Sequence, residues 1–128
     1  MASVSRFAVP RAGLSAHLLG VSQGILLLTT GQLWGRLALA PVLSRAAASL
    51  VVGGGYAAWT ANVAAAVWGA GGALLPHAAG AARGSAGQEL LILLLLRGGG
   101  LALVAGWLFI LWGLRGAAAR DAAAPPPS

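Results

Sequence analysis

The stretch LSAHLLGVSQGILLLTTGQLW, residues 14–34, determines the class of fold that this sequence can adopt. It is 21 residues long, mostly apolar and without a charged side chain. A helix of that length rises about 30 Å, which matches the hydrocarbon thickness of a bilayer. Arg6 and Arg11 precede the run, as basic residues do in a signal peptide, but the run is long enough for a full span. We therefore predict a retained transmembrane helix.

Two further apolar runs have the length of a membrane span. The earlier one is uncharged, and the glycines and Pro76 that follow it are typical of a helix end. The prediction is an all-α integral membrane bundle, oligomeric, with three transmembrane helices in this chain. The predicted segments are a polar N-terminal segment at 1–12, a membrane helical domain at 13–116 with spans at 14–34, 46–70 and 88–114, and a disordered tail at 117–128. The spans are joined by linkers at 35–45 and 71–87, and the second linker holds His77 and Arg83.

The composition supports a membrane protein and excludes several classes of function. Only 8% of the residues are charged and 59% are hydrophobic, whereas a soluble domain has about 25% charged residues. The net charge of +6 comes from arginines that are scattered between apolar runs, so no nucleic-acid partner is predicted. Since the chain has no cysteine, disulfides and thiolate chemistry are excluded.

The first span carries small residues and an imidazole on one face. At 100° per residue, His17, Gly20, Gly24 and Gly31 lie along this face, and two of them form a GxxxG motif. Such glycines commonly let two helices pack closely. A glycine groove beside an imidazole also lets a flat macrocycle lie against the helix, with the imidazole on its metal. The pattern alone leaves both interpretations open, and for a single His an interfacial hydrogen bond is the commoner role.

The other two spans hold polar side chains that hydrocarbon does not solvate. Asn62 lies on the same face as Trp59, so its amide is expected to hydrogen-bond to another helix or to face a cavity. Arg97 is expected to reach the membrane surface or to pair with an anion, and the three glycines after it predict a kink or close packing. Glu89 and Asp121 are the only acidic residues, so no paired-carboxylate site is predicted.

Four blocks of the sequence carry motifs of a known family. The blocks are GLSAHLLGVSQG at 13–24, YAAWTANVAAAVWGAG at 56–71, LLPHAAGAARGSAGQELL at 74–91 and GLALVAGWLFILWGLRG at 100–116. Together they resemble the hydroxylaminobenzene mutases, which are small bacterial membrane proteins. The resemblance covers residues 12–116, and the first two blocks are its most specific parts. Styrene oxide isomerase is similar to this chain at a greater distance.

The sequence departs from the family pattern at three places. Gln23 stands where the family has Asn, which keeps the amide but adds one methylene group. Ala58 replaces the Asn of the family's YANW motif. The family usually has a further helix before the first block, whereas only residues 1–12 precede that block here. We therefore expect three spans against four in the family, either because that helix is absent or because the true start lies upstream.

The resemblance implies a function and a cofactor. The implied function is a membrane isomerase of the bacterial inner membrane, which rearranges an arylhydroxylamine, a small aromatic substrate, to an aminophenol. The implied assembly is a homotrimer in contact with membrane lipid, with haem b between subunits and its iron as a Lewis acid. His17 would be the axial ligand of that iron. The glycine face at Gly20 and Gly24 and the cation of Arg97 are the further haem contacts that we predict from the pattern of the spans.

The resemblance implies that Gln23 lies near the substrate, and it places Asn62 where the family has a substrate-side Tyr. We predict three residues that act on the substrate. Gln23 and Asn62 would hold its polar atoms, and Trp59 would face the positive charge that develops on its ring. Two alternatives stay open from the sequence. One is an epoxide isomerase of the styrene oxide isomerase type, and the other is a non-catalytic small membrane subunit.

Overall fold

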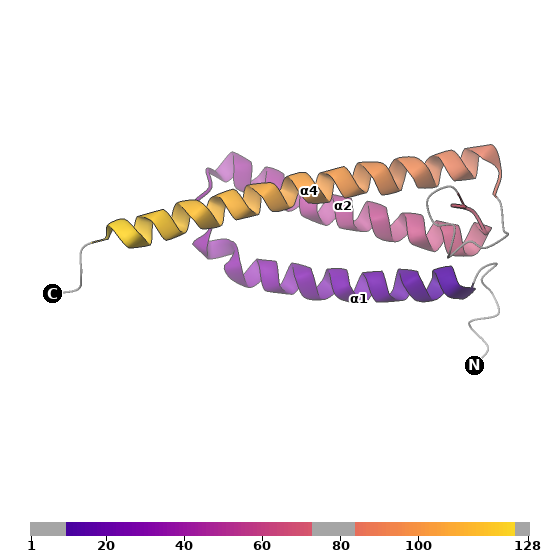
Figure 1. Cartoon of the computed structure of the whole chain (residues 1–128), viewed down its shortest axis with the longest axis horizontal. Helices are drawn as coiled ribbons and strands as arrows, with labels where there is room; N and C mark the ends of the chain where they lie inside the picture. Colours follow the sequence, from indigo (N-terminus) through magenta and orange to yellow (C-terminus); the bar gives the residue numbers. More distant parts are fainter. Residues whose placement is uncertain (1–9, 73–83, 125–128) are drawn as a thin grey trace.

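The computed structural model describes residues 10–72 and 84–124, which form a bundle of long helices (Figure 1). The helices are α1 (Pro10–Leu33), α2 (Pro41–Trp68) and α4 (Ala86–Ala123), and a short 3-10 turn, η2 (Trp34–Arg36), follows α1. α2 packs against both α1 and α4 and runs antiparallel to them. All three α-helices are long and apolar enough to cross a membrane. Since the described residues contain no strand, the predicted all-α class with three possible spans is confirmed.

The ends of α2 and α4 are set by local sequence signals. Pro41 is at the start of α2, where its missing N–H group has no intrahelical partner to lose. α2 ends at Gly69, whose φ of 64° lies in the left-handed region that favours glycine. α4 begins with a capping box, in which the backbone N–H of Gln88 donates to the Ser85 hydroxyl and the Ser85 N–H donates to the Gln88 side chain.

Three boundaries differ from the prediction by four residues or more. α1 begins at Pro10 rather than at residue 14, so its first turn lies in the segment predicted to be polar. α2 begins at Pro41 rather than at residue 46, because a proline at the first position starts a helix although Arg45 interrupts the apolar run. α4 continues through Ala123, so residues 117–123 are helical rather than disordered. This segment is rich in alanine, which has the highest intrinsic helix propensity. The predicted features that fall in 1–9, 73–83 and 125–128, among them His77 and Arg83, lie outside the described residues.

Small residues bring α2 and α4 into close contact. Buried positions recur every seven residues on α4, and three of these four are glycines: Ile92, Gly99, Gly106 and Gly113. A Cβ atom on Gly99 would lie 2.8 Å from the carbonyl oxygen of Gly54, and a Cβ atom on Gly54 would lie 2.7 Å from the carbonyl oxygen of Gly99. The two backbones are therefore too close for a side chain at this crossing. Of the two effects predicted for the three consecutive glycines, close packing is confirmed.

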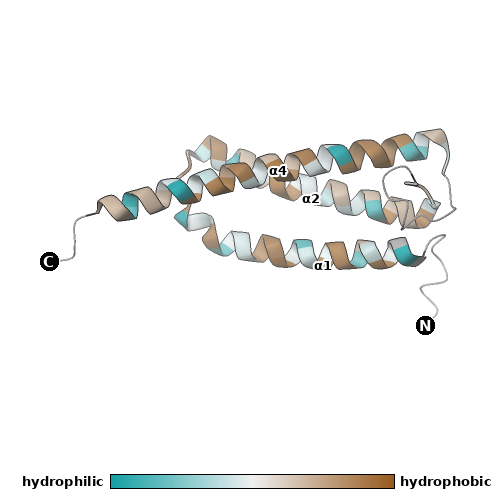
Figure 2. Ribbon diagram, in the orientation of Figure 1, coloured by the Kyte–Doolittle hydropathy of each residue, from teal (hydrophilic) through white to brown (hydrophobic). Residues whose placement is uncertain are grey.

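The outward faces of α1 and α4 are apolar. Leu14 and Leu18 on α1 are 61% and 56% exposed, and Leu101 and Trp112 on α4 are 73% and 72% exposed. Hydrophobic residues recur along the full length of all three helices (Figure 2). A helix at the surface of a soluble protein has a polar outer face, whereas these faces suit lipid. The chain is therefore a membrane protein.

Candidate active site between α1 and α2

A groove between α1 and α2 contains two adjoining pockets. The first has a volume of about 500 Å³ and the second of about 260 Å³. Gly20 of α1 and Trp59 of α2 line both pockets and so form the boundary between them. The first pocket is also lined by Gly13, Ala16, His17, Val21 and Val63. The second is also lined by Gln23, Gly24, Leu27, Gly55 and Tyr56.

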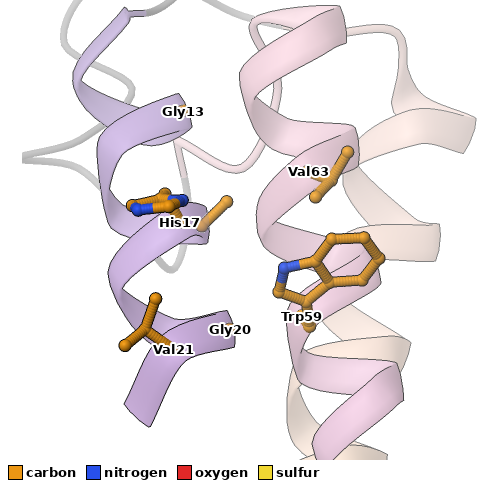
Figure 3. Close-up of a pocket in the computed structure, with 7 residues that line it drawn as sticks. Gly13, His17, Gly20, Val21, Trp59 and Val63 are labelled. Atoms are coloured by element: carbon orange, nitrogen blue, oxygen red, sulfur yellow. The ribbon is translucent and has the colours of Figure 1, made fainter. Parts of the chain in front are cut away.

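The first pocket combines one imidazole with apolar walls. His17 lies seven residues after the start of α1, about 10 Å along the helix. Its side chain is exposed to the pocket, and no hydrogen bond between described residues occupies either ring nitrogen. His17 and Val21 project from α1, while Trp59 and Val63 project from α2 across the groove (Figure 3). The imidazole is thus available to a ligand.

The indole of Trp59 lies over Gly20. A Cβ atom on Gly20 would be 3.0 Å from the indole Nε1 and 3.3 Å from Cδ1. A Cβ atom on Gly24, one turn further along α1, would meet nothing within 4 Å. The GxxxG motif was predicted either to pack against another helix or to leave a groove for a ligand. At Gly24 no helix among the described residues packs closely. Both glycines line the groove instead.

Adding a methyl group at Gly20 is expected to move the Trp59 indole and to lower kcat/KM. A misplaced group in an active site commonly reduces the rate by on the order of tenfold or more. The measurement is isomerase kinetics of Gly20→Ala, together with its tryptophan emission spectrum. The control is Gly31→Ala on the same helix, where a Cβ atom meets nothing within 4 Å. Equal effects of the two substitutions would show that the contact between Gly20 and Trp59 is unimportant.

The second pocket contains an amide and a phenol. The amide of Gln23 lies against Gly55, where an added Cβ atom would overlap it. Tyr56 also lines this pocket and is 63% exposed. Sequence reasoning did not select Tyr56 as a site residue. A phenol near the middle of an apolar run was the available signal, because a hydroxyl in hydrocarbon needs a partner.

Two of the predicted site residues line neither pocket. The side-chain amide of Asn62 donates to the carbonyl oxygen of Ala58 at 2.9 Å, so its N–H group is satisfied within α2. Arg97 is exposed on α4, whereas its neighbour Gly99 is buried against α2. Within one copy of the chain, Arg97 therefore faces away from the groove. The structure brings together the other five: His17, Gly20, Gln23, Gly24 and Trp59.

The described residues do not form a protein-only metal centre. No group of three or more His, Cys, Asp or Glu side chains in 10–72 and 84–124 lies close enough to hold a metal ion.

Comparison with known proteins identifies the family. The sequence model of the family described as styrene oxide isomerase matches residues 3–115. The chain belongs to the styrene oxide isomerase family. The relative named hydroxylaminobenzene mutase HabB, from Ectopseudomonas oleovorans, is 44% identical to this family member over 124 residues, which cover 93% of this chain and 76% of the relative. No solved structure matches the chain.

These findings confirm the resemblance to hydroxylaminobenzene mutase and to styrene oxide isomerase. Both names denote enzymes that convert a compound into its isomer. This member of the styrene oxide isomerase family is therefore a membrane isomerase, and the alternative of a non-catalytic subunit is not supported.

Proposed function

We propose that the chain rearranges an arylhydroxylamine to an aminophenol in the bacterial inner membrane. The observation that carries the proposal is the groove between α1 and α2, in which an imidazole, an amide and an indole meet within apolar walls. The relative named hydroxylaminobenzene mutase supports this choice of substrate. An apolar groove between transmembrane helices suits a small aromatic compound that partitions into lipid.

The volume and the imidazole of the first pocket support haem as the cofactor. Its volume of about 500 Å³ lies within the range of roughly 300–1,000 Å³ for ligand and cofactor pockets. Haem needs only one or two axial ligands from protein, so a single imidazole is sufficient. His17 would be that ligand. The indole of Trp59 covers Gly20, so the open face of α1 lies at Gly24, in the adjoining second pocket. Bound haem b would supply a Lewis acid.

The groove residues would act on the substrate as it rearranges. In the overall reaction the N–O bond breaks, a C–O bond forms at the ortho carbon, that carbon loses a proton and the nitrogen gains one. Trp59 presents an indole to positive charge that develops on the substrate ring. Gln23 hydrogen-bonds to a polar atom of the substrate from the second pocket. The apolar walls keep water from the reacting carbon.

Arg97 acts in this proposal through a second copy of the chain. It lies eleven residues after the start of α4, and His17 lies seven residues after the start of α1. Both helices start at the same end of the bundle (Figure 1), so Arg97 lies about 16 Å along α4 from that end and His17 about 10 Å along α1. In a homotrimer, Arg97 of one copy would pair with a carboxylate of the haem held by its neighbour. Asn62 has no direct role on substrate within one copy, because its amide donates to α2.

The proposed function predicts a defined product. Protein purified in mild detergent and supplied with haemin is expected to convert hydroxylaminobenzene to 2-aminophenol, which chromatography detects. Styrene oxide is tested in parallel, because the family description favours an epoxide isomerase as the second candidate. Conversion of styrene oxide alone would support that candidate, and conversion of neither compound would contradict the proposal.

A further inference from the structure

Tyr56 carries a hydroxyl deep in the membrane-spanning part of the groove. It is the sixteenth of the 28 residues of α2 and lies near the middle of that helix. Its side chain lines the second pocket and is 63% exposed. No hydrogen bond between described residues involves its hydroxyl group. Since hydrocarbon provides no hydrogen-bond partner, the hydroxyl is suited to a ligand with a polar atom.

Gln23 contributes an amide to the same pocket. Its amide occupies the space that a Cβ atom at position 55 would take, so glycine at that position admits it. None of the hydrogen bonds in 10–72 and 84–124 involves this amide. Together the two side chains offer one O–H group, one NH₂ group and one amide carbonyl. The other residues that line the pocket are glycine, leucine and tryptophan, so the pocket has no charged wall.

The polar pair lies in the pocket that adjoins the imidazole's pocket. Gln23 follows His17 by six residues on α1, which corresponds to a rise of about 9 Å. Gly20 and Trp59 lie between them and border both pockets. Because the two pockets adjoin, a benzene ring with groups at opposite positions can extend from one into the other. A ring that lies along Trp59 with its hydroxylamine group toward the first pocket has its far end at Gln23 and Tyr56 in the second.

We propose that the substrate is an arylhydroxylamine with a neutral hydrogen-bonding substituent opposite its hydroxylamine group, and that Tyr56 and Gln23 bind this substituent. The inference rests on the proposed arylhydroxylamine isomerase function. A carboxamide fits the pocket because it donates and accepts hydrogen bonds, as the two side chains do. A carboxylate does not fit, because no cation lines the second pocket to offset the cost of removing its charge from water.

The test compares kcat/KM for three substrates: hydroxylaminobenzene, 4-(hydroxyamino)benzamide and 4-(hydroxyamino)benzoate. The benzamide is expected to be preferred over hydroxylaminobenzene by about tenfold, the effect of one net hydrogen bond. The benzoate is expected to be the poorest of the three. Tyr56→Phe is expected to remove most of the preference, chiefly through KM. Gly55→Ala is expected to do the same, because the added methyl group displaces the flexible end of Gln23.

The matched control is Thr29→Val, which removes a hydroxyl from an exposed position on α1 outside both pockets. The Thr29 hydroxyl donates to the carbonyl oxygen of Ile25 at 2.9 Å, so it is already satisfied within the helix. This variant is expected to keep the preference for the benzamide. If Tyr56→Phe slows both neutral substrates equally, the hydroxyl serves the reacting group or the fold, and the inference is wrong. A wild-type enzyme without preference for the benzamide also overturns it.

A binding measurement separates this inference from the proposed function. Aniline and 4-aminobenzamide lack the N–O bond and cannot react. We expect 4-aminobenzamide to quench tryptophan fluorescence at about tenfold lower concentration than aniline, and Tyr56→Phe to abolish the difference. If neither hydroxylamine is rearranged but this binding difference is found, only the proposed function fails. Equal binding of the two anilines overturns the recognition of the substituent.

Discussion

Changing His17 to alanine is expected to abolish haem binding and to lower turnover of hydroxylaminobenzene by at least about a hundredfold. The imidazole is the side chain in the first pocket with a nitrogen free to bind a metal. A Lewis acid stabilises a transition state by several kcal/mol, and each 1.36 kcal/mol corresponds to a factor of about ten in rate. The measurement is the Soret absorption of the purified variant after addition of haemin, followed by the assay for aminophenol.

The control for this experiment is Leu18→Ala. Leu18 is the next residue on α1, is 56% exposed and lines neither pocket. The variant is expected to retain the Soret band and the activity. A wild-type protein that shows no Soret band even after haemin is added would contradict the haem proposal. A His17→Ala variant that keeps the band would contradict the assignment of the axial ligand.

Changing Gly99 to alanine is expected to destabilise the bundle, whereas the same change at its neighbour Gly98 is expected to stabilise it slightly. A Cβ atom on Gly99 would lie 2.8 Å from the carbonyl oxygen of Gly54 and 3.1 Å from the backbone nitrogen of Ala58, so one helix must move away. Overpacking of this kind costs about 1–3 kcal/mol. A Cβ atom on Gly98 meets nothing within 4 Å, and alanine is the better helix former by roughly 0.5–1 kcal/mol.

The measurement is the free energy of unfolding of each variant in a detergent titration, compared with the wild-type protein. The two alanine variants have the same composition and differ by one position in the chain. The opposite sign of their effects therefore reports the contact between α2 and α4. If both changes stabilise the protein, the two helices do not approach each other as closely as the structure places them.

The helices could be predicted from the sequence because each apolar run is as long as a bilayer is thick. Their ends were less predictable. Pro41 starts α2 before the apolar run becomes continuous, and the alanine-rich end of α4 remains helical to Ala123. Both features depend on backbone preferences rather than on hydropathy. The contact between Gly54 and Gly99 was also beyond the sequence, because it requires the register of two antiparallel helices.

The candidate site was partly predictable because the positions that share one face of a helix can be read from the sequence. Helical periodicity places His17, Gly20 and Gly24 on one face of α1, and the structure finds all three along the groove. The rotation of α2 relative to that face cannot be read from periodicity. It brings Trp59 and Tyr56 into the groove and leaves the amide of Asn62 bonded within its own helix. The roles in catalysis stay predictions.

We propose that the rearrangement is intramolecular and takes place in a groove that excludes water, so the source of the product oxygen distinguishes it from a reaction with water. The reaction is run with hydroxylaminobenzene in water labelled with oxygen-18, and the 2-aminophenol is analysed by mass spectrometry. Since apolar side chains form most of the groove walls, the product is predicted to keep the substrate's own oxygen and to show no label. Label in the phenol oxygen at the level of the solvent would show that water reaches the reacting ring carbon, and the proposed intramolecular rearrangement would be wrong.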